Sequence, residues 1–266
     1  MNVLIISAVV VAAVGIIVGF GLGLFGEKFK VEIDEREVAI RAELPGNNCG
    51  ACGFPGCDGL ARAINEGRAP VNQCPVGGAP VAAKIGAIMG VEAGETVRKV
   101  AFVKCNGTCD QTQRKDVYYG IMDCSKAMNV PGGGDKACAY GCLGYGSCVK
   151  ACEFDAIHVV NGVAVVDKEK CTSCGKCAAA CPKRLIDLVP YEAEHLVRCS
   201  SQDKGKNVKE VCGTGCIACT LCVRNCPQKA ISMNGNVALI DYANCTNCGT
   251  CASKCPTGAI KGRELA

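Results

Sequence analysis

Cys171-Thr-Ser-Cys174-Gly-Lys-Cys177-Ala-Ala-Ala-Cys181-Pro182 is one of three closely similar stretches in this chain of 266 residues. The other two begin at Cys216 and Cys245 and keep the same spacing, C-x2-C-x2-C-x3-C-P. In this spacing three neighbouring thiolates bind one 4Fe–4S cube, and the fourth cysteine reaches the cube of a partner motif. Three full copies are far beyond chance, so the spacing indicates iron–sulfur clusters and predicts electron transfer.

The cysteine content excludes two other kinds of cysteine site. Disulfide frameworks are typical of short secreted chains without a core, whereas this chain is long, 49% hydrophobic, and groups its 25 cysteines in fours. Zinc ribbons place two C-x2-C hooks a dozen or more residues apart and supply no third cysteine after two more residues. We therefore expect iron–sulfur clusters on reduced thiols, which predicts that the cysteine-bearing part lies in the cytoplasm.

The composition also argues against nucleic-acid binding and local catalysis. The net charge is only +4, aromatic residues make up 5% of the chain, and tryptophan is absent. A basic patch and aromatic stacking platforms are the usual means of nucleic-acid binding. No acid–base or nucleophilic constellation, flavin-attachment motif or P-loop stands out, and we predict no catalytic residue and no nucleic-acid partner.

A fourth copy of the motif, which precedes the others, is irregular. It runs Cys142-Leu-Gly-Tyr145-Gly-Ser-Cys148-Val-Lys-Ala-Cys152, with tyrosine in the place of the second cysteine. Phenolate ligation is conceivable but rare, and Cys138, four residues upstream, is the better candidate for the replacement ligand. The four motifs then predict two pairs of cubes, held by Cys138, Cys142, Cys148 and Cys181; Cys152, Cys171, Cys174 and Cys177; Cys216, Cys219, Cys222 and Cys255; and Cys226, Cys245, Cys248 and Cys251.

Short apolar segments between the motifs predict two β-hairpins. Residues 156–160 and 163–166 flank Asn161-Gly162, and residues 231–233 and 237–240 flank a second turn built around Asn and Gly. Two short apolar strands around Asn-Gly are the strongest local signal for a hairpin. Such hairpins are expected between the halves of a ferredoxin fold.

The two pairs look like a diverged tandem duplication. Val103-Lys-Cys105 and Val197-Arg-Cys199 precede the pairs in similar positions, and Cys138-x3-Cys142 resembles Cys212-x3-Cys216. Repetition of this kind indicates two related units, over residues 103–190 and 197–265.

Five cysteines remain outside these quartets. Cys105, Cys109 and Cys124, together with one distant cysteine, could hold a sixth cluster, or they could be free or structural thiols. The five candidate ligands of an extra cluster are Cys105, Cys109, Cys124, Cys199 and Cys212.

A different cysteine pattern lies nearer the N-terminus. Leu44-Pro-Gly-Asn-Asn-Cys49-Gly-Ala-Cys52-Gly-Phe-Pro-Gly-Cys57 is followed by Cys74, which gives the spacing C-x2-C-x4-C-x16-C. Its glycines let the backbone wrap a cube closely and direct amides at the sulfurs. A short helix is expected over residues 58–66. We predict a single 4Fe–4S cube here, with a structural zinc site as the alternative.

The N-terminal segment predicts a membrane anchor. Residues Val3–Phe25 contain no charged side chain and are long enough to cross a hydrocarbon core. A cleaved signal peptide fits less well, because no basic residue precedes the run, the run is too long and no A-x-A-like site follows it. Lys28 and Lys30 on the C-terminal flank predict an N-terminus outside and everything after residue 26 in the cytoplasm.

The run Leu44–Cys57 resembles the single-cluster domain of B subunits of the Rnf complex, and also that of the corrinoid iron–sulfur subunit of acetyl-CoA synthesis. An apolar helix, this domain and tandem ferredoxin motifs, in that order, are similar to the Rnf B subunit along the whole chain. The resemblance implies the electron-transfer subunit of a membrane-bound ion-translocating ferredoxin:NAD oxidoreductase. Its implied partners are other membrane subunits, a flavin/NAD-binding subunit and soluble ferredoxin. Many family members carry two ferredoxin motifs, whereas this chain carries four.

The expected fold is α+β, with one N-terminal transmembrane helix, a small single-cluster 4Fe–4S domain and tandem bacterial-ferredoxin-like domains that together hold at least five cubes. A polyferredoxin subunit of a hydrogenase or formate-oxidising complex would not explain the run Leu44–Cys57. A redox-sensing iron–sulfur regulator would need an effector or DNA-binding segment, and none is visible. The predicted domains are an anchor (1–26), a single-cluster domain (27–91), a first ferredoxin-like pair (92–192) and a second pair (193–266).

Overall fold

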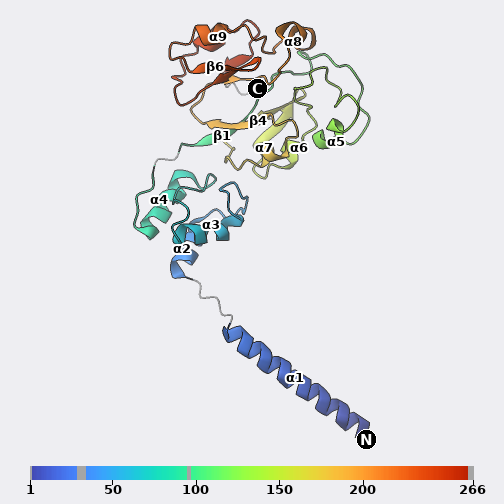
Figure 1. Cartoon of the computed structure of the whole chain (residues 1–266), viewed down its shortest axis with the longest axis vertical. Helices are drawn as coiled ribbons and strands as arrows, with labels where there is room; N and C mark the ends of the chain where they lie inside the picture. The colour runs from blue at the N-terminus through green and yellow to red at the C-terminus, as the bar shows by residue number, and fades with distance from the viewer. Residues whose placement is uncertain (1, 29–33, 95–96, 263–266) are drawn as a thin grey trace.

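A computed structural model describes residues 2–28, 34–94 and 97–262. Three parts follow one another along the chain (Figure 1). They are a long helix, a module of three helices, and a larger body that contains short strands and short helices. The first four helices are α1 (Asn2–Lys28), α2 (Glu35–Glu43), α3 (Gly56–Asn65) and α4 (Gly78–Met89).

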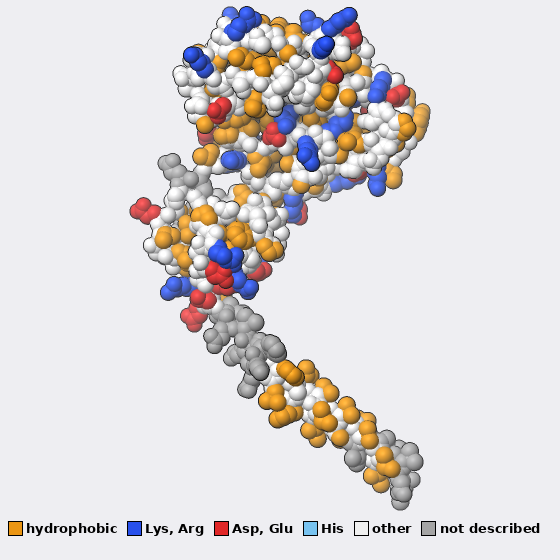
Figure 2. All heavy atoms as spheres, viewed as in Figure 1, with side chains coloured by type: hydrophobic (Ala, Val, Ile, Leu, Met, Phe, Trp, Pro, Cys, Tyr) orange, Lys and Arg blue, Asp and Glu red, His pale blue; other side chains and the backbone are white. Residues whose placement is uncertain are grey.

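The N-terminal helix corrects one sequence prediction. Side chains of α1 are described at residues 5–6 and 10–25, where they are almost all hydrophobic and exposed (Figure 2). Within the described residues, no helix is both long and apolar enough to cross a membrane. This finding overturns the predicted transmembrane helix over Val3–Phe25 and the predicted single-pass placement in the cytoplasmic membrane. Lys30 lies outside the described residues.

The three-helix module packs around a small apolar core. Helix α3 buries Leu60 and Ile64 on one face, which confirms the helix expected over residues 58–66. Ile40 of α2 and Ile85 of α4 are fully buried against them. Burying a side chain of this size contributes about 1.5–3 kcal/mol before conformational entropy is counted. The module therefore has its own core, in which aliphatic side chains pack together with the cysteines.

The larger body consists of two halves built on the same plan. In each half two strands in the middle of the sequence form a hairpin, and the first and last strands of that half pair with each other as a second two-stranded sheet. All four strand pairs are antiparallel: β1 (Lys99–Val103) with β4 (Ile186–Pro190), β2 (Ile157–Val160) with β3 (Val163–Val166), β5 (His195–Val197) with β8 (Ile260–Gly262), and β6 (Ile231–Asn234) with β7 (Val237–Ile240).

Both predicted hairpins are confirmed. Between β2 and β3, Asn161 and Gly162 have φ values of 46° and 75°. A type I′ turn requires positive φ at both central residues, and Asn-Gly is the sequence that best tolerates it. In the second hairpin Gly235 supplies the positive φ, at 61°. The local turn chemistry therefore determines where each ferredoxin-like half folds back.

Each of the four ferredoxin-type cysteine motifs contains a short helix. They are α6 (Ser147–Lys150), α7 (Lys176–Ala180), α9 (Leu221–Arg224) and α10 (Thr250–Ser253). The third cysteine of each motif lies on such a helix and is buried: Cys148, Cys177, Cys222 and Cys251. Two further helices lie in the segments that precede the motifs, α5 (Cys124–Met128) and α8 (Gly205–Val211).

The core of each half contains sulfur at its centre. In the first half Cys148 and Cys177 pack with Ile157 and Val163, and in the second half Cys222 and Cys251 pack with equivalent apolar residues. The apolar side chains come from the hairpin and from both outer strands of each half. This repetition of strands, helices and buried cysteines agrees with the duplication expected from sequence.

Candidate iron–sulfur cluster sites

The first site lies in the three-helix module. Cys57, at the start of α3, and Cys74 are buried, and Cys52 packs against the same core. The Cys57 amide donates to Asn48 Oδ1 at 2.8 Å, and the Cys74 sulfur accepts from the Gly77 amide at 3.4 Å. Burial raises the pKa of Cys74, and the nearby thiols of Cys52 and Cys57 raise it further. Three of the four predicted thiols therefore gather in one place.

The fourth predicted ligand of this module, Cys49, lies toward the ferredoxin-like body. Cys49 interacts electrostatically with Cys174, a cysteine of the first ferredoxin-like half. The Lys176 ammonium lies near both thiols and forms an ion pair with Glu153. The module and the body therefore approach each other through cysteines that belong to two different predicted quartets.

One predicted quartet of the first half lines a single cavity. Its members are Cys152, Cys171, Cys174 and Cys177. The sulfurs of Cys171 and Cys152 each accept from a backbone amide at 3.4 Å. Amide hydrogen bonds of this kind stabilise negative charge on cluster sulfurs and tune the cluster potential. Burial raises the pKa of Cys177 to about 11, with neighbouring thiols adding to the effect.

The neighbouring quartet differs from the sequence assignment. Cys142, Cys148 and Cys181 line one cavity, as predicted, but the fourth cysteine there is Cys124. Burial raises the pKa of Cys148 to about 12, and the thiols of Cys142, Cys124 and Cys181 contribute to that rise. Cys138 does not line this cavity. The structure thus gives Cys124 the place that the sequence assigned to Cys138.

Cys124 is held there by contacts at the start of α5. The Cys124 amide donates to Ser147 Oγ at 2.8 Å, and Ser147 Oγ donates to Asp123 Oδ2 at 2.9 Å. Asp123 also caps α5 by accepting from the Ser125 amide. These bonds fix the first turn of α5 against α6, which bears Cys148. Since they join segments far apart in the sequence, motif spacing alone gives no signal for them.

Tyr145 points away from the cluster cavity. Its hydroxyl donates to Asp135 Oδ1 at 3.0 Å, and its ring lies 5.1 Å from that of Tyr118. Burial and the Asp135 carboxylate raise the pKa of Tyr145 to about 12. A phenol this reluctant to ionise is a poor iron ligand compared with a thiol.

The second half brings its two predicted quartets together in the same way. Cys222 interacts with Cys216, Cys219 and Cys255, so the fourth cysteine of the last motif joins the three of the preceding motif. In the partner group, Cys251 interacts with Cys245 and Cys248. Cys226 packs against the same apolar core. Cys248 is exposed, and this quartet therefore reaches the surface.

Groups of four cysteines supply the thiolate ligands that a 4Fe–4S cube needs. Within the described residues, no three His, Cys, Asp or Glu side chains are placed to hold one metal ion. Tetrahedral zinc needs sulfurs about 2.3 Å from one centre. A 4Fe–4S cube binds each thiolate at a different iron corner and therefore takes sulfurs that lie farther apart. Cavities lined by four cysteines fit the cube.

Lys136 places a buried positive charge beside the thiols. The side chain is 5% exposed, and its ammonium donates to the carbonyls of Gly107 and Gly162 at 2.9 and 2.7 Å. Lys136 interacts electrostatically with Cys105 and Cys142. A cube gains negative charge when it is reduced, so this ammonium favours the reduced form.

Replacing Lys136 with methionine is expected to lower the potential of the cube at Cys142. The loss of about 1 kcal/mol of attraction corresponds to a few tens of millivolts, since 59 mV equals a tenfold change for one electron. A redox titration followed by EPR measures the shift. Lys206→Met, at an exposed position on α8, is the matched control and should shift no potential. Equal potentials in wild type and Lys136→Met would contradict this role.

Of the 25 cysteines, all of which are described, five lie outside these quartets. Cys109 is exposed, and its sulfur accepts from Arg114 at 3.4 Å. The other four, Cys105, Cys138, Cys199 and Cys212, gather at the junction of the two halves.

Comparison with known families agrees with the cysteine quartets. A family model for an Fe–S cluster domain matches residues 44–76. A 4Fe-4S binding domain matches residues 164–187, and a 4Fe-4S dicluster domain matches residues 215–259. The chain therefore contains several 4Fe–4S domains, and multiple 4Fe–4S clusters are its cofactors.

Curated relatives resemble the chain over nearly its whole length. The B subunit of the Na(+)-translocating ferredoxin:NAD(+) oxidoreductase complex of Acetobacterium woodii is 48% identical over 98% of this chain and 79% of the relative. The B subunit of the ion-translocating oxidoreductase complex of Methanosarcina acetivorans is 43% identical over 98% of this chain and 99% of its own. The B subunit of the proton-translocating ferredoxin:NAD(+) oxidoreductase complex of Clostridium ljungdahlii is 40% identical over 98% and 93%. With this identity over almost the full chain, and with the cysteine quartets in place, the protein belongs to the family of B subunits of Rnf-type ion-translocating oxidoreductase complexes.

Proposed function

We propose that this subunit relays single electrons from reduced ferredoxin, through a chain of 4Fe–4S clusters, to a partner subunit that binds flavin and NAD. Electron transfer between cubes makes and breaks no bonds, so the protein contributes spacing, burial and tuning of potential. Relatives from Acetobacterium woodii and Clostridium ljungdahlii are named as subunits of ferredoxin:NAD(+) oxidoreductase complexes. Their names differ in the ion, sodium in one and protons in the other.

The observation that carries this proposal is the contact between successive quartets. Cys49 of the N-terminal module interacts with Cys174 of the first half. Within that half, Cys177 and Cys148 belong to adjacent quartets and pack in one core. Neighbouring quartets allow an electron to enter at one end of the chain and leave at another.

The proposed ligand sets follow from these cavities and contacts. The N-terminal module (27–91) would hold one cube, and the two ferredoxin-like pairs (92–192 and 193–266) would hold two each. The proposed ligands are Cys49, Cys52, Cys57 and Cys74; Cys124, Cys142, Cys148 and Cys181; Cys152, Cys171, Cys174 and Cys177; Cys216, Cys219, Cys222 and Cys255; and Cys226, Cys245, Cys248 and Cys251.

The test is anaerobic mixing of the purified, oxidised chain with reduced ferredoxin. We expect the ferredoxin to be oxidised while the visible absorbance of the cubes bleaches, with more than one electron taken up per chain. Dithionite provides the control for intact, reducible cubes. Cubes that accept electrons from dithionite but not from reduced ferredoxin would contradict ferredoxin as the donor. Reduction by hydrogen or formate through the matching enzyme, but not by ferredoxin, would favour a polyferredoxin of another complex.

A further inference from the structure

Four cysteines that the regular motifs leave over line one cavity between the two halves. They are Cys105, Cys138, Cys199 and Cys212. The cavity has a volume of about 20 Å³, the same as each of the two cavities lined by the quartets of the first half. A site of the same size, also lined by four cysteines, therefore lies at the junction.

The four sulfurs are close to one another. A Cβ atom added at Gly107 would lie 3.6 Å from the sulfurs of both Cys105 and Cys212. Cys138 interacts electrostatically with Cys212, and Cys199 interacts with Cys138. These contacts connect all four thiols into one group.

The group follows the internal duplication, with two members from each half. Cys105 lies two residues after β1, and Cys199 lies two residues after β5. Cys138 precedes Cys142 by four residues, as Cys212 precedes Cys216. The four cysteines at the junction therefore occupy two equivalent sequence positions in each half.

The hydrogen bonds repeat as well. The Cys105 sulfur accepts from the Cys142 amide at 3.3 Å and from the Gly107 amide at 3.4 Å. The Cys199 sulfur accepts from the Ser201 amide at 3.5 Å and from the Cys216 amide. Cys142 and Cys216 are ligands in neighbouring quartets. One amide bond on each side thus joins the junction site to a quartet of each half.

The segment between β1 and α5 fixes the two halves around this site. The Gln113 amide donates to the Val211 carbonyl at 3.0 Å, and the Gly213 amide donates to the Gln111 carbonyl at 2.8 Å. Between these two bonds, Thr112 Oγ1 lies 3.7 Å from the Cys212 sulfur. These bonds hold Cys212, at the end of α8, against the first half.

Positive groups surround the site. Lys183 donates to the Gly141 carbonyl at 3.1 Å and interacts with Cys138 and Cys105. Lys104 and Arg198 line the same cavity. A cube bound by four thiolates carries net negative charge, which these cations offset.

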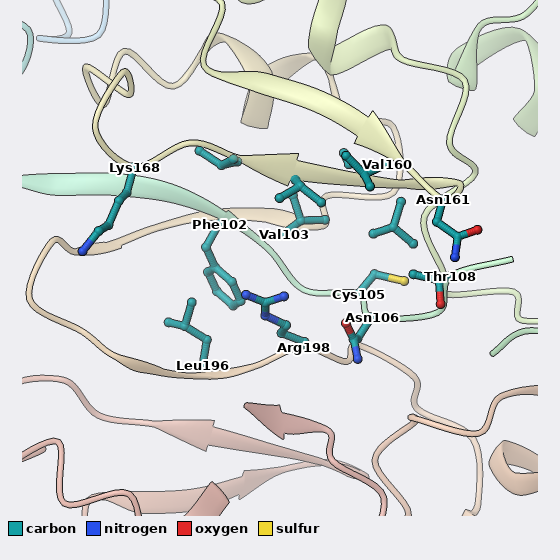
Figure 3. Close-up of a pocket in the computed structure, with 14 residues that line it drawn as sticks. Phe102, Val103, Cys105, Asn106, Thr108, Val160, Asn161, Lys168, Leu196 and Arg198 are labelled. Atoms are coloured by element: carbon teal, nitrogen blue, oxygen red, sulfur yellow. The ribbon is translucent and has the colours of Figure 1, made fainter. Parts of the chain in front are cut away.

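A second cavity, of about 270 Å³, is lined by residues of both halves and also by Cys105. Figure 3 shows Cys105 beside Asn106 and Thr108, with Phe102, Leu196 and Arg198 farther along the cavity. Cys105 and Arg198 line both cavities. The walls of the junction therefore come from strands and loops of both halves.

We propose that Cys105, Cys138, Cys199 and Cys212 bind a sixth 4Fe–4S cube, which passes electrons between the two ferredoxin-like halves. One electron enters this cube from one half and the same electron leaves to the other, so no bond forms or breaks. The inference rests on the proposed electron-relay function, but iron content tests it separately from any transfer to or from ferredoxin. It leaves Cys109 as the single cysteine outside the quartets.

The test compares three forms of the full chain purified anaerobically. The wild type should contain about 24 iron atoms, four for each of six cubes, and the double variant Cys138→Ala/Cys212→Ala should contain about 20. Cys109→Ala, the matched control, should keep about 24. A wild-type content of about 20, or an unchanged content in the double variant, would overturn the proposal. So would about one zinc per chain that disappears from the double variant.

A second test uses the single variant Cys199→Ser and measures EPR spectra and electron transfer instead of iron content. In the single variant Cys199→Ser, EPR should show one cube altered or converted to a three-iron form, while the signals of the other five persist. Slower electron exchange between the halves, with ferredoxin still able to reduce the first half, supports the proposal. Alteration or loss of five cubes would indicate that the variant misfolds. In that case the iron content of the wild type decides, since about 24 atoms per chain supports the sixth cube and about 20 overturns it. Unaltered EPR spectra in Cys199→Ser would overturn the assignment.

Discussion

Replacing Cys124 with alanine is expected to remove one cube or leave it in a three-iron form, whereas Tyr145→Phe should leave the iron content unchanged. Cys124 lines the cavity of Cys142, Cys148 and Cys181, and Tyr145 instead donates its hydroxyl to Asp135. A thiol of reference pKa about 8.5 binds iron far more readily than a phenol of about 10. Iron analysis and EPR of both purified variants measure the difference. Electron transfer through the first half should fall at least tenfold in Cys124→Ala.

Paired variants distinguish this assignment from the one that places Cys138 with Cys142. Cys124→Ala/Cys142→Ala removes two ligands of one cube and should cost about four iron atoms. Cys138→Ala/Cys142→Ala removes one ligand from each of two different cubes and should alter both. If the Cys138 pair alters only one cube and the Cys124 pair alters two, the structural assignment is contradicted and the sequence-based one is restored.

Removing iron with a chelator is expected to unfold the two ferredoxin-like halves but not the three-helix module. The cores of the halves contain five buried cysteines, Cys142, Cys148, Cys177, Cys222 and Cys251, next to short strands of three to five residues. Small domains organised around a metal centre lose their fold when the centre is removed. Hydrogen exchange followed by mass spectrometry should show residues 97–262 losing most of their protection.

The module provides the internal control for this experiment. Ile40, Leu60, Ile64 and Ile85 are at most 1% exposed and pack in one core with Cys57 and Cys74, between helices of nine to twelve residues. Peptides from residues 34–43 and 78–89 should keep part of their protection after iron removal. Full protection of residues 97–262 in the iron-free chain would show that the halves fold without clusters, which contradicts the role given to them.

Regular motifs and turn signals could be predicted from the sequence because their causes are local. The spacing of Cys171 to Cys177 brings three thiols to one cavity, and Asn161-Gly162 reverses the chain through two positive φ values. The apolar face of α3 likewise follows from its own residues. Each of these features depends on a few neighbouring residues, so a pattern describes it fully.

The irregular ligands could not be predicted in this way because their causes are long-range. Cys138 is nearer to Cys142 in sequence than Cys124 is, yet bonds from Asp123 and Cys124 to Ser147 bring α5 to the cluster cavity. Cys138 instead meets Cys199 and Cys212 of the other half. The duplicated positions of Cys105 and Cys199 were visible in the sequence, but only the packing of the two halves shows that these residues meet. The predicted membrane span was wrong, since no described helix is both long and apolar enough to cross a membrane.

The central claim is that this chain is an electron carrier with a series of 4Fe–4S cubes. The most direct measurement is the iron and acid-labile sulfide content of the full chain, purified without oxygen. The account predicts about 24 iron and 24 sulfide per chain, and no fewer than about 20 of each from the five quartets that the motifs define. A content near twelve, equal to three cubes, would contradict it.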